Sequence, residues 1–199
     1  MLKMVLITKE NVNEALAVFH RIFSWIPKEA DPYTGVLNGQ MAETKARYYM
    51  VYDGENIVGI TGFYIVPEDP ESAFLGWFGV VPEMRRYHYG SKIIRLHEEE
   101  LRSLGYKYSR LYTEAENNDA TRGFYERNGY EAEAYDCPKE PARMKGVIVT
   151  YSKSLGDWPL IPWNSRYMNL ASEAKMMYTE EQLKNMDTLM AAMKAAEHA

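Results

Sequence analysis

Cysteine is nearly absent from this 199-residue sequence: Cys137 stands alone, so no disulfide can form within the chain. This excludes the small disulfide-stapled extracellular domains and fits a reducing compartment. Long apolar runs are also missing, since the longest nearly apolar stretch, residues 74–81, is too short to span a bilayer. Residues 1–10 lack the long apolar region of a signal peptide. We therefore expect a cytoplasmic protein with no membrane partner, and we interpret Cys137 as a thiol without a functional role.

An excess of positive charge is missing as well. The 23 Lys and Arg residues stand against 28 Asp and Glu residues, which gives a net charge of −5. Proteins that bind nucleic acid usually carry a basic footprint, so we expect no nucleic-acid partner. The basic side chains do gather within one stretch of eleven residues, at Arg85, Arg86, His88, Lys92 and Arg95. This cluster fits either a site for a small anionic ligand or a solvated group of surface charges.

The hydrophobic periodicity predicts an α/β domain with a mixed sheet. One helix is expected to begin after an N-cap at Thr8 and to end before Pro27. Asp53-Gly54 between two strand-like runs predicts a hairpin, because Gly accepts the positive φ of the turn. The three strands expected at 47–52, 57–66 and 73–81 should form an antiparallel meander. The predicted strands are 4–8, 47–52, 57–66, 73–81, 108–114, 130–135 and 147–152, and the further helices are 41–46, 90–104 and 119–128.

The stretch from Val80 to Lys92 reads as a strand, a basic turn and the start of a helix. Unsatisfied N–H groups and the positive end of the helix dipole both point at such a turn, which makes it a place for phosphate oxygens. Gly90 allows a close approach of the backbone to a ligand, and Ser91 adds a hydroxyl at the helix start. The sequence therefore favours a phosphate-containing ligand here.

Two separate signatures resemble those of the GNAT superfamily of N-acetyltransferases. The first is the acyl-CoA loop, in which Arg85 and Gly90 match the family pattern and Pro82 stands where members often carry proline. His88 replaces the first glycine of that pattern, which is a departure from it. The second signature lies downstream, and every one of its positions is filled, by Asn117, Ala120, Phe124, Tyr125, Gly129 and Tyr130.

The resemblance implies a GNAT-like fold over residues 1–155 and transfer of an acetyl group from acetyl-CoA to a primary amine, with no metal. It implies that the pantetheine arm of CoA lies between the strands at 74–81 and 108–114, with backbone groups near Val80 and the side chain of Asn117 binding it. The pyrophosphate would be held by the loop residues Arg85, Arg86, Tyr87, His88, Tyr89, Gly90 and Ser91.

The resemblance also implies a proton donor for the departing thiolate, and Tyr125 matches the tyrosine that supplies it in the family. The alternative for Tyr125 is a packing role on an amphipathic helix. The base that deprotonates the amine is expected to be Glu116 or Glu114, which would share one face if the strand extends that far. The alternative is a pair of acids that only face solvent. His97 lies on the apolar helix face and is interpreted as a core histidine.

Two other readings of the whole chain stay open at this point. One is a non-catalytic acyl-CoA-binding or regulatory module of the same fold. The other, a P-loop nucleotide binder, is disfavoured because no Gly-Lys-Ser/Thr follows the loop. The acceptor also stays open between a small amine, an antibiotic, a peptide N-terminus and a lysine side chain. Several aromatic residues suggest that the acceptor binds on an aromatic-rich side of the site, and the alternative is that they belong to the hydrophobic core. These residues are Tyr33, Tyr48, Tyr49, Tyr64, Trp77 and Phe78.

Residues 156–199 form a C-terminal extension of a different character. A strap rich in Trp and Pro at 157–163 precedes a capping box at 179–182 and an amphipathic helix. The apolar stripe of that helix should dock, either on its own domain or on a second copy in a homodimer, and a disordered tail is the alternative. The stripe consists of Leu183, Met186, Met190 and Met193.

Overall fold

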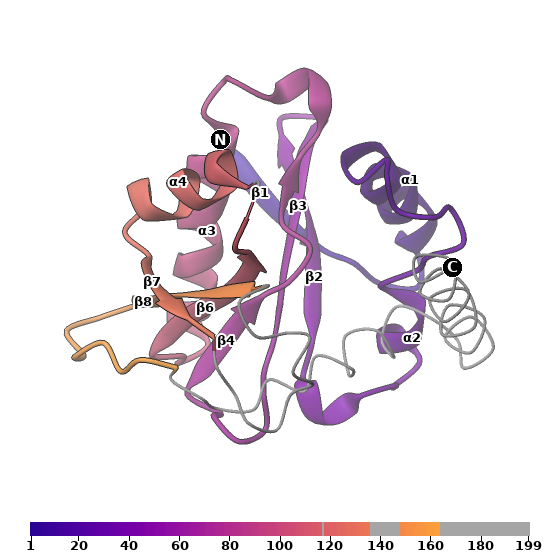
Figure 1. Ribbon diagram of the computed structural model, residues 1–199. Helices are drawn as coiled ribbons and strands as arrows, with labels where there is room; N and C mark the ends of the chain where they lie inside the picture. Colours follow the sequence, from indigo (N-terminus) through magenta and orange to yellow (C-terminus); the bar gives the residue numbers. More distant parts are fainter. Residues whose placement is uncertain (117, 136–147, 164–199) are drawn as a thin grey trace, which may run out of the picture.

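The computed structural model describes residues 1–116, 118–135 and 148–163 (Figure 1). Its strands are β1 (Leu2–Leu6), β2 (Arg47–Asp53), β3 (Asn56–Tyr64), β4 (Ser72–Leu75), β5 (Gly79–Val80), β6 (Tyr108–Glu114), β7 (Glu131–Ala134) and β8 (Ile148–Ser154). Its helices are α1 (Val12–Ile22), α2 (Thr34–Leu37), α3 (Tyr89–Ser103) and α4 (Asp119–Arg127), with single 3-10 turns η1 (Ala42–Thr44) and η2 (Pro82–Met84). None of these helices is long and apolar enough to cross a membrane.

The strands form one mixed sheet in the order β1-β2-β3-β4-β6-β8-β7, and β5 pairs with β3 outside that path. Strands β4 and β6 run parallel, whereas the other neighbours are antiparallel. Helices α1 and α2 cover one face of the sheet, and α3 and α4 cover the other (Figure 1). This arrangement confirms the predicted α/β class, the mixed sheet and the antiparallel meander of β2, β3 and β4.

Both long helices pack through the apolar stripe that the periodicity predicts. Helix α1 buries Ala15, Val18, Phe19 and Ile22. Helix α3 buries Ile93, Ile94, His97, Glu98 and Leu101. The predicted hairpin is also present, because Asp53 pairs with Asn56 and Gly54 adopts φ +61° between them. Local periodicity and turn chemistry therefore account for these elements.

Several local predictions are wrong in detail. Helix α1 begins after Asn11 rather than after Thr8, because the Asn11 side-chain oxygen accepts a hydrogen bond from the Thr8 N–H at 2.8 Å and closes a turn before the helix. Strand β1 accordingly ends earlier than expected, at Leu6. The helix expected at 41–46 is the single 3-10 turn η1, and α2 precedes it where the sequence predicts none.

The single strand expected over 73–81 is divided into β4 and β5 by a β-bulge. Phe63 of β3 pairs with Leu75, and Ile60 pairs with Gly79, so two residues of β3 lie opposite the three residues 76–78. An extra residue of this kind bends the strand and re-aims the side chains that follow. The bulge therefore decides which face of the sheet each later side chain meets.

Trp77 lies at the centre of the bulge and adopts φ +46°, a left-handed conformation. For an L-residue this conformation costs about 1–2 kcal/mol. Edge-to-face contacts with Phe19 and Phe23, whose ring centroids lie 4.9 and 5.3 Å away, hold the Trp77 ring on the α1 side of the sheet. The packing of three aromatic rings thus stabilises a strained backbone.

Arg110 of β6 is completely buried where β4, β6 and β8 meet. Its guanidinium donates hydrogen bonds to the Ser72 hydroxyl at 2.8 Å, to the Ser152 hydroxyl at 2.6 Å and to the Ile161 carbonyl at 2.8 Å. A buried cation is tolerated only when its donors are satisfied in this way. Arg110 therefore joins two neighbouring strands to the chain that follows β8.

The described part of the C-terminal extension, residues 156–163, packs on the sheet. Trp163 is completely buried, and its ring meets Phe74 edge to face with centroids 4.8 Å apart. The backbone N–H of Trp163 donates a hydrogen bond to the Glu133 carboxylate at 2.7 Å. The strap is thus docked on its own domain, while the helix predicted around Leu183 lies outside the described residues.

His97 is a core histidine, as the helix periodicity predicts. It is fully buried on α3, and its Nδ1 hydrogen-bonds with the Thr61 hydroxyl at 3.1 Å. The Nε2 atom is buried without a hydrogen-bond partner among the described residues. Burial lowers the pKa of His97 from 6.5 to about 3, because the charged imidazolium cannot be solvated there.

We expect His97 to make the fold sensitive to acid. The unfolded chain binds a proton at this residue below pH 6.5, whereas the folded chain does so only near pH 3. The stability that it contributes is therefore complete above pH 6.5 and is lost as the pH falls toward 3, by about 1.4 kcal/mol per pH unit. Urea unfolding of His97→Gln and wild type from pH 7 to pH 4 should show this difference in slope. The exposed His88, replaced by Gln, is the control; equal slopes for wild type and His97→Gln would contradict the prediction.

Candidate active site

The sheet opens between β4–β5 and β6. The two sides pair only from Ser72 with Tyr108 to Phe74 with Arg110. Beyond this point the chain stays paired with β3 through β5, after the bulge, while β6 continues along β8 to Glu114. The two strands between which the resemblance implies that CoA lies therefore diverge here, and the first of them is broken by the bulge.

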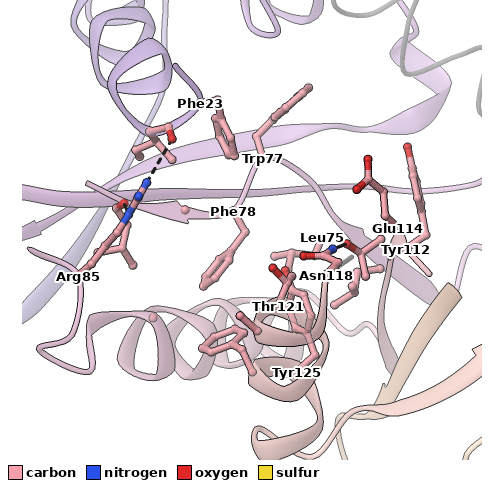
Figure 2. Close-up of a pocket in the computed structure, with 18 of the residues that line it drawn as sticks. Phe23, Leu75, Trp77, Phe78, Arg85, Tyr112, Glu114, Asn118, Thr121 and Tyr125 are labelled. Atoms are coloured by element: carbon pink, nitrogen blue, oxygen red, sulfur yellow. Dashed lines mark hydrogen bonds between the residues drawn. The ribbon is translucent and has the colours of Figure 1, made fainter. Parts of the chain in front are cut away.

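A cleft of about 1060 Å³ occupies this opening (Figure 2). Side chains from both faces of the sheet line it, so it passes between the strands from one helical layer to the other. In Figure 2, Arg85 lies at one end, and Tyr112 and Glu114 lie at the other. The lining also includes Ile22, Phe23, Trp25, Leu75, Trp77, Phe78, Gly79, Val80, Gly90, Leu111, Thr113, Asn118, Ala120, Thr121, Phe124, Tyr125 and Ile148.

The backbone of β5 presents hydrogen-bonding groups to this cleft. Val80 faces Gly59 of β3, but the bond across the ladder runs from the Val81 N–H to the Val58 carbonyl at 3.1 Å. In an antiparallel ladder this pattern directs the N–H and C=O of Val80 away from β3, toward the side on which the cleft lies. The carbonyl accepts a hydrogen bond from Arg85 Nε at 3.2 Å. The Val80 N–H is left for another partner.

The turn at 85–88 leads directly into the N-terminus of α3. Arg86 and His88 both adopt positive φ, at +69° and +62°, and the side chains of both are exposed. Gly90 lines the cleft, and a Cβ added to it would lie 3.0 Å from the Phe124 ring. The first N–H groups of α3 thus lie at a close-packed corner between α3 and α4, where an anion is favoured.

The predicted loop residues do not all point their side chains at the cleft. Arg85 lines it and also donates to the Ile22 carbonyl at 3.3 Å, which ties the loop to the end of α1. Tyr89 donates its hydroxyl proton to the Asp53 carboxylate at 2.8 Å, and this bond is the main reason why the pKa of Asp53 is lowered. The Tyr89 side chain therefore anchors α3 to the β2–β3 hairpin. Tyr87 is exposed, and Ser91 is partly buried on the first turn of α3.

Tyr125 of α4 lines the middle of the cleft and is 7% exposed. Its ring lies among Phe124, Tyr130 and Tyr151, with centroids 5.2, 5.7 and 5.8 Å away. Burial raises the pKa of Tyr125 well above its ordinary value. Its hydroxyl makes no hydrogen bond to any residue that the structure describes. The phenol is consequently protonated at neutral pH and has its proton to offer.

The two acids considered as bases take different positions. Glu114 ends β6 and lines the cleft. Glu116 is exposed in the bend that follows and is not among the lining residues. Strand β6 does not extend to residue 116, so the condition under which the two carboxylates would share a strand face is not met. Asn117 lies outside the described residues.

Sequence reasoning missed several lining residues, and three of them have side chains suited to contact a ligand. Asn118 donates a hydrogen bond to the Thr113 hydroxyl at 2.6 Å and lines the cleft. Phe23 and Trp25, at the end of α1 and just beyond it, line the cleft next to Trp77. A Trp shortly before Pro27, where the first helix is predicted to end, is the signal that could have been read for this site.

The other aromatic residues considered for an acceptor side are core residues. Their side chains are no more than 6% exposed, and none of them lines the cleft: Tyr33, Tyr48, Tyr49 and Tyr64. Trp77 and Phe78 do line it. Phe78 stacks on Phe124 with centroids 5.6 Å apart, on the side of the sheet that α4 covers. No cluster of His, Cys, Asp or Glu able to hold a metal ion is present among the described residues.

The sequence model of the acetyltransferase (GNAT) family matches residues 12–130. No curated protein matches the chain. Among solved structures, the ribosomal-protein-S18-alanine N-acetyltransferase of Escherichia coli is similar, at 14% identity and a TM-score of 0.58, over 85% of this chain and 99% of that one.

Two further solved structures share the fold. Mutant forms of the spermidine/spermine N-acetyltransferase of Vibrio cholerae match at 15% identity and a TM-score of 0.58, over 78% of this chain and 95% of theirs. The PaiA N-acetyltransferase of Thermoplasma acidophilum, in complex with coenzyme A, matches at 16% identity and a TM-score of 0.57, over 77% of this chain and 99% of that one. The names of the Escherichia coli and Vibrio cholerae enzymes give different acceptors, so the shared fold does not define the acceptor of this chain.

We expect His88→Gly to stabilise the protein. Residue 88 has φ +62°, which glycine adopts freely, whereas a side chain there costs about 1 kcal/mol or more. Thermal denaturation should show a melting temperature higher by about 2–4 °C for a protein of this size. Tyr87→Gly is the matched control, since residue 87 does not have a positive φ and gains nothing from glycine. A lower melting temperature for His88→Gly would mean that the imidazole stabilises the loop.

Proposed function

This chain belongs to the acetyltransferase (GNAT) family and is an acyl-CoA-dependent N-acetyltransferase; we propose that it transfers an acetyl group from acetyl-CoA to a primary amine by direct attack. One observation carries the proposal beyond the family: the cleft between the diverging strands has a helix N-terminus at one end, and the buried Tyr125 lines it between that end and Glu114 (Figure 2). Such a cleft fits a long ligand with phosphates at one end.

The described residues fit acetyl-CoA, which supplies the acetyl group as a thioester. The Val80 N–H lacks a partner in the sheet and would hydrogen-bond the pantetheine arm. The N–H groups of the turn at 85–91 would hold the pyrophosphate, with the exposed side chains of Arg86 and His88 beside it. We propose that Arg85 acts there mainly through its charge, because two backbone carbonyls already accept its hydrogen bonds. Asn117 remains proposed to fix the arm from the opposite strand.

The acceptor amine must lose a proton before it can attack. A lysine-like amine has a pKa of about 10.4, so fewer than about one molecule in a thousand is neutral at pH 7. Glu116 remains proposed as the base, acting through water from its exposed position. Glu114 is the second candidate, supported by its place in the cleft lining.

Tyr125 is proposed to assist the departing sulfur. The amine nitrogen forms a bond to the carbonyl carbon, the carbon–sulfur bond breaks, and the electron pair of that bond remains on sulfur. The Tyr125 hydroxyl would then give a hydrogen bond or its proton to the thiolate. Burial raises the pKa of Tyr125, so the phenol stays protonated through the neutral range and gives up its proton only as negative charge develops on the sulfur.

We expect acetyl-CoA to bind and stabilise the folded protein, and to be consumed with one amine at least. At about 100 times its Kd, acetyl-CoA should add roughly 2.7 kcal/mol to the free energy of unfolding. A thermal shift series with acetyl-CoA and a release assay for free thiol across a panel of amines measure both. No shift at millimolar acetyl-CoA would refute the proposal. A shift without thiol release for any amine would favour the non-catalytic acyl-CoA-binding module instead.

Tyr125→Phe should lower kcat by about 10²–10⁴-fold and leave the affinity for acetyl-CoA nearly unchanged. The substitution removes only the hydroxyl, and the ring contacts that hold α4 stay in place. Tyr130→Phe is the matched control: that ring lies 5.7 Å from Tyr125, but its hydroxyl bonds the buried Ser109 hydroxyl and is not among the lining groups. Turnover of Tyr125→Phe at the wild-type rate in saturating substrate would leave Tyr125 with a packing role only.

A further inference from the structure

The cleft reaches both faces of the sheet, because residues at the end of α1 line it on one face and residues of α4 line it on the other; we call these two sides its openings. On one face, Phe78 stacks on Phe124 and Gly90 packs against that same ring, so this opening lies between α3 and α4. On the other face, the end of α1 covers β5, because a Cβ on Gly79 would overlap Ile22 and would meet the Phe23 ring. The helix N-terminus proposed for the phosphates belongs to the first opening. The acceptor is therefore left with the second one, on the α1 face.

Three aromatic rings form a wall at this second opening, and we call them the aromatic lip: Phe23, Trp25 and Trp77. Phe23 meets Trp77 and Trp25 edge to face, with centroids 5.3 and 5.5 Å away. Trp25 is 74% exposed although it lines the cleft. A large aromatic side chain that is left exposed beside a cleft is typical of a binding surface, because contact with an apolar ligand would remove its area from water.

The bulge turns Trp77 toward this lip. Its backbone adopts a left-handed φ of +46° that a bulky residue avoids, and the ring packs on Phe19 of α1 and on Phe23, which follows that helix. Strained conformations of this kind collect at ligand sites, where the surrounding structure holds them. The conformation of Trp77 therefore supports a role of this ring in binding.

The charges in the cleft are few and lie far apart. Glu114 is the one acidic side chain among the described lining residues, and Arg85 is the one basic side chain. In Figure 2 they lie at opposite ends, and Glu114 is next to Tyr112 on the side away from the phosphate loop. One ammonium group can meet one carboxylate here, while a polyamine would leave its other cations beside aromatic carbon.

We infer that the acceptor is a primary amine with a single positive charge, carried on an aromatic or other large apolar body. The ammonium group approaches the sheet opening beside Glu114, and the apolar body lies against the aromatic lip. This inference rests on the proposed function and adds the class of acceptor to it.

The test compares two amines that differ only in the apolar body, 2-phenylethylamine and ethylamine, together with spermidine. Binding is measured by calorimetry on the full chain saturated with CoA, and kcat/KM is measured by thiol release with acetyl-CoA. Burial of a phenyl-sized group should favour 2-phenylethylamine over ethylamine by about 10- to 100-fold in both measurements. Spermidine should bind more weakly than 2-phenylethylamine.

A variant pair ties this preference to the lip. In Trp25→Ala, the ratio of kcat/KM for 2-phenylethylamine to kcat/KM for ethylamine should fall at least several-fold, through a change in KM rather than in kcat. The variant should fold normally because the Trp25 side chain is exposed. Trp158→Ala is the matched control: Trp158 is 51% exposed as well, but it covers Lys107 and is not a lining residue.

The possible failures point to different claims. Equal binding of 2-phenylethylamine and ethylamine, binding of neither, tighter binding of spermidine, or an unchanged ratio in Trp25→Ala would each overturn the inference about the acceptor. The proposed function would still stand in these cases if acetyl-CoA stabilises the protein and any amine releases thiol. Absence of a shift with acetyl-CoA would instead remove the proposed function itself.

Discussion

The pairing of β4 with β6 ends after three residues on each strand, and the site depends on that short contact. The parallel bonds stop at Phe74 and Arg110, the last pair before the strands diverge. Arg110 is buried there and satisfies its guanidinium on both neighbouring strands and on the strap. Because a buried cation that lost these partners would be costly, the sheet is held closed up to this point and opens only beyond it.

An opened sheet leaves backbone groups without partners, and this deficit suits the protein to an extended ligand. Buried N–H and C=O groups are nearly always paired in native proteins. On the open side of β5, the Val80 carbonyl is satisfied by Arg85, whereas its N–H has no partner in the sheet. A ligand that carries amide groups, as pantetheine does, would complete the ladder that β6 has left. The same divergence thus creates both the space and the hydrogen-bonding need.

Much of the fold follows from local signals in the sequence, and the fine geometry of the site does not. The Asp53-Gly54 hairpin and the stripe of α3 depend on residues close together in the chain, so periodicity and turn chemistry predict them. The bulge at Trp77 depends on rings from α1, far away in the sequence. The end of β6 at Glu114 likewise depends on where β8 stops pairing with it. Sequence reasoning could therefore name the loop and Tyr125, yet not Trp25 or Asn118.

Contacts at the end of α1 connect the two openings of the cleft. Arg85 of the loop donates to the Ile22 carbonyl, and Arg21 pairs with Glu83 of η2, one turn before that loop. The residue that follows α1 is Phe23, whose ring contacts both Trp25 and Trp77. A shift of the loop toward bound phosphates would thus reach the aromatic lip through a single helix terminus. Coupling of this kind would let occupation of one opening alter the affinity of the other, because the helix end makes direct contacts with both.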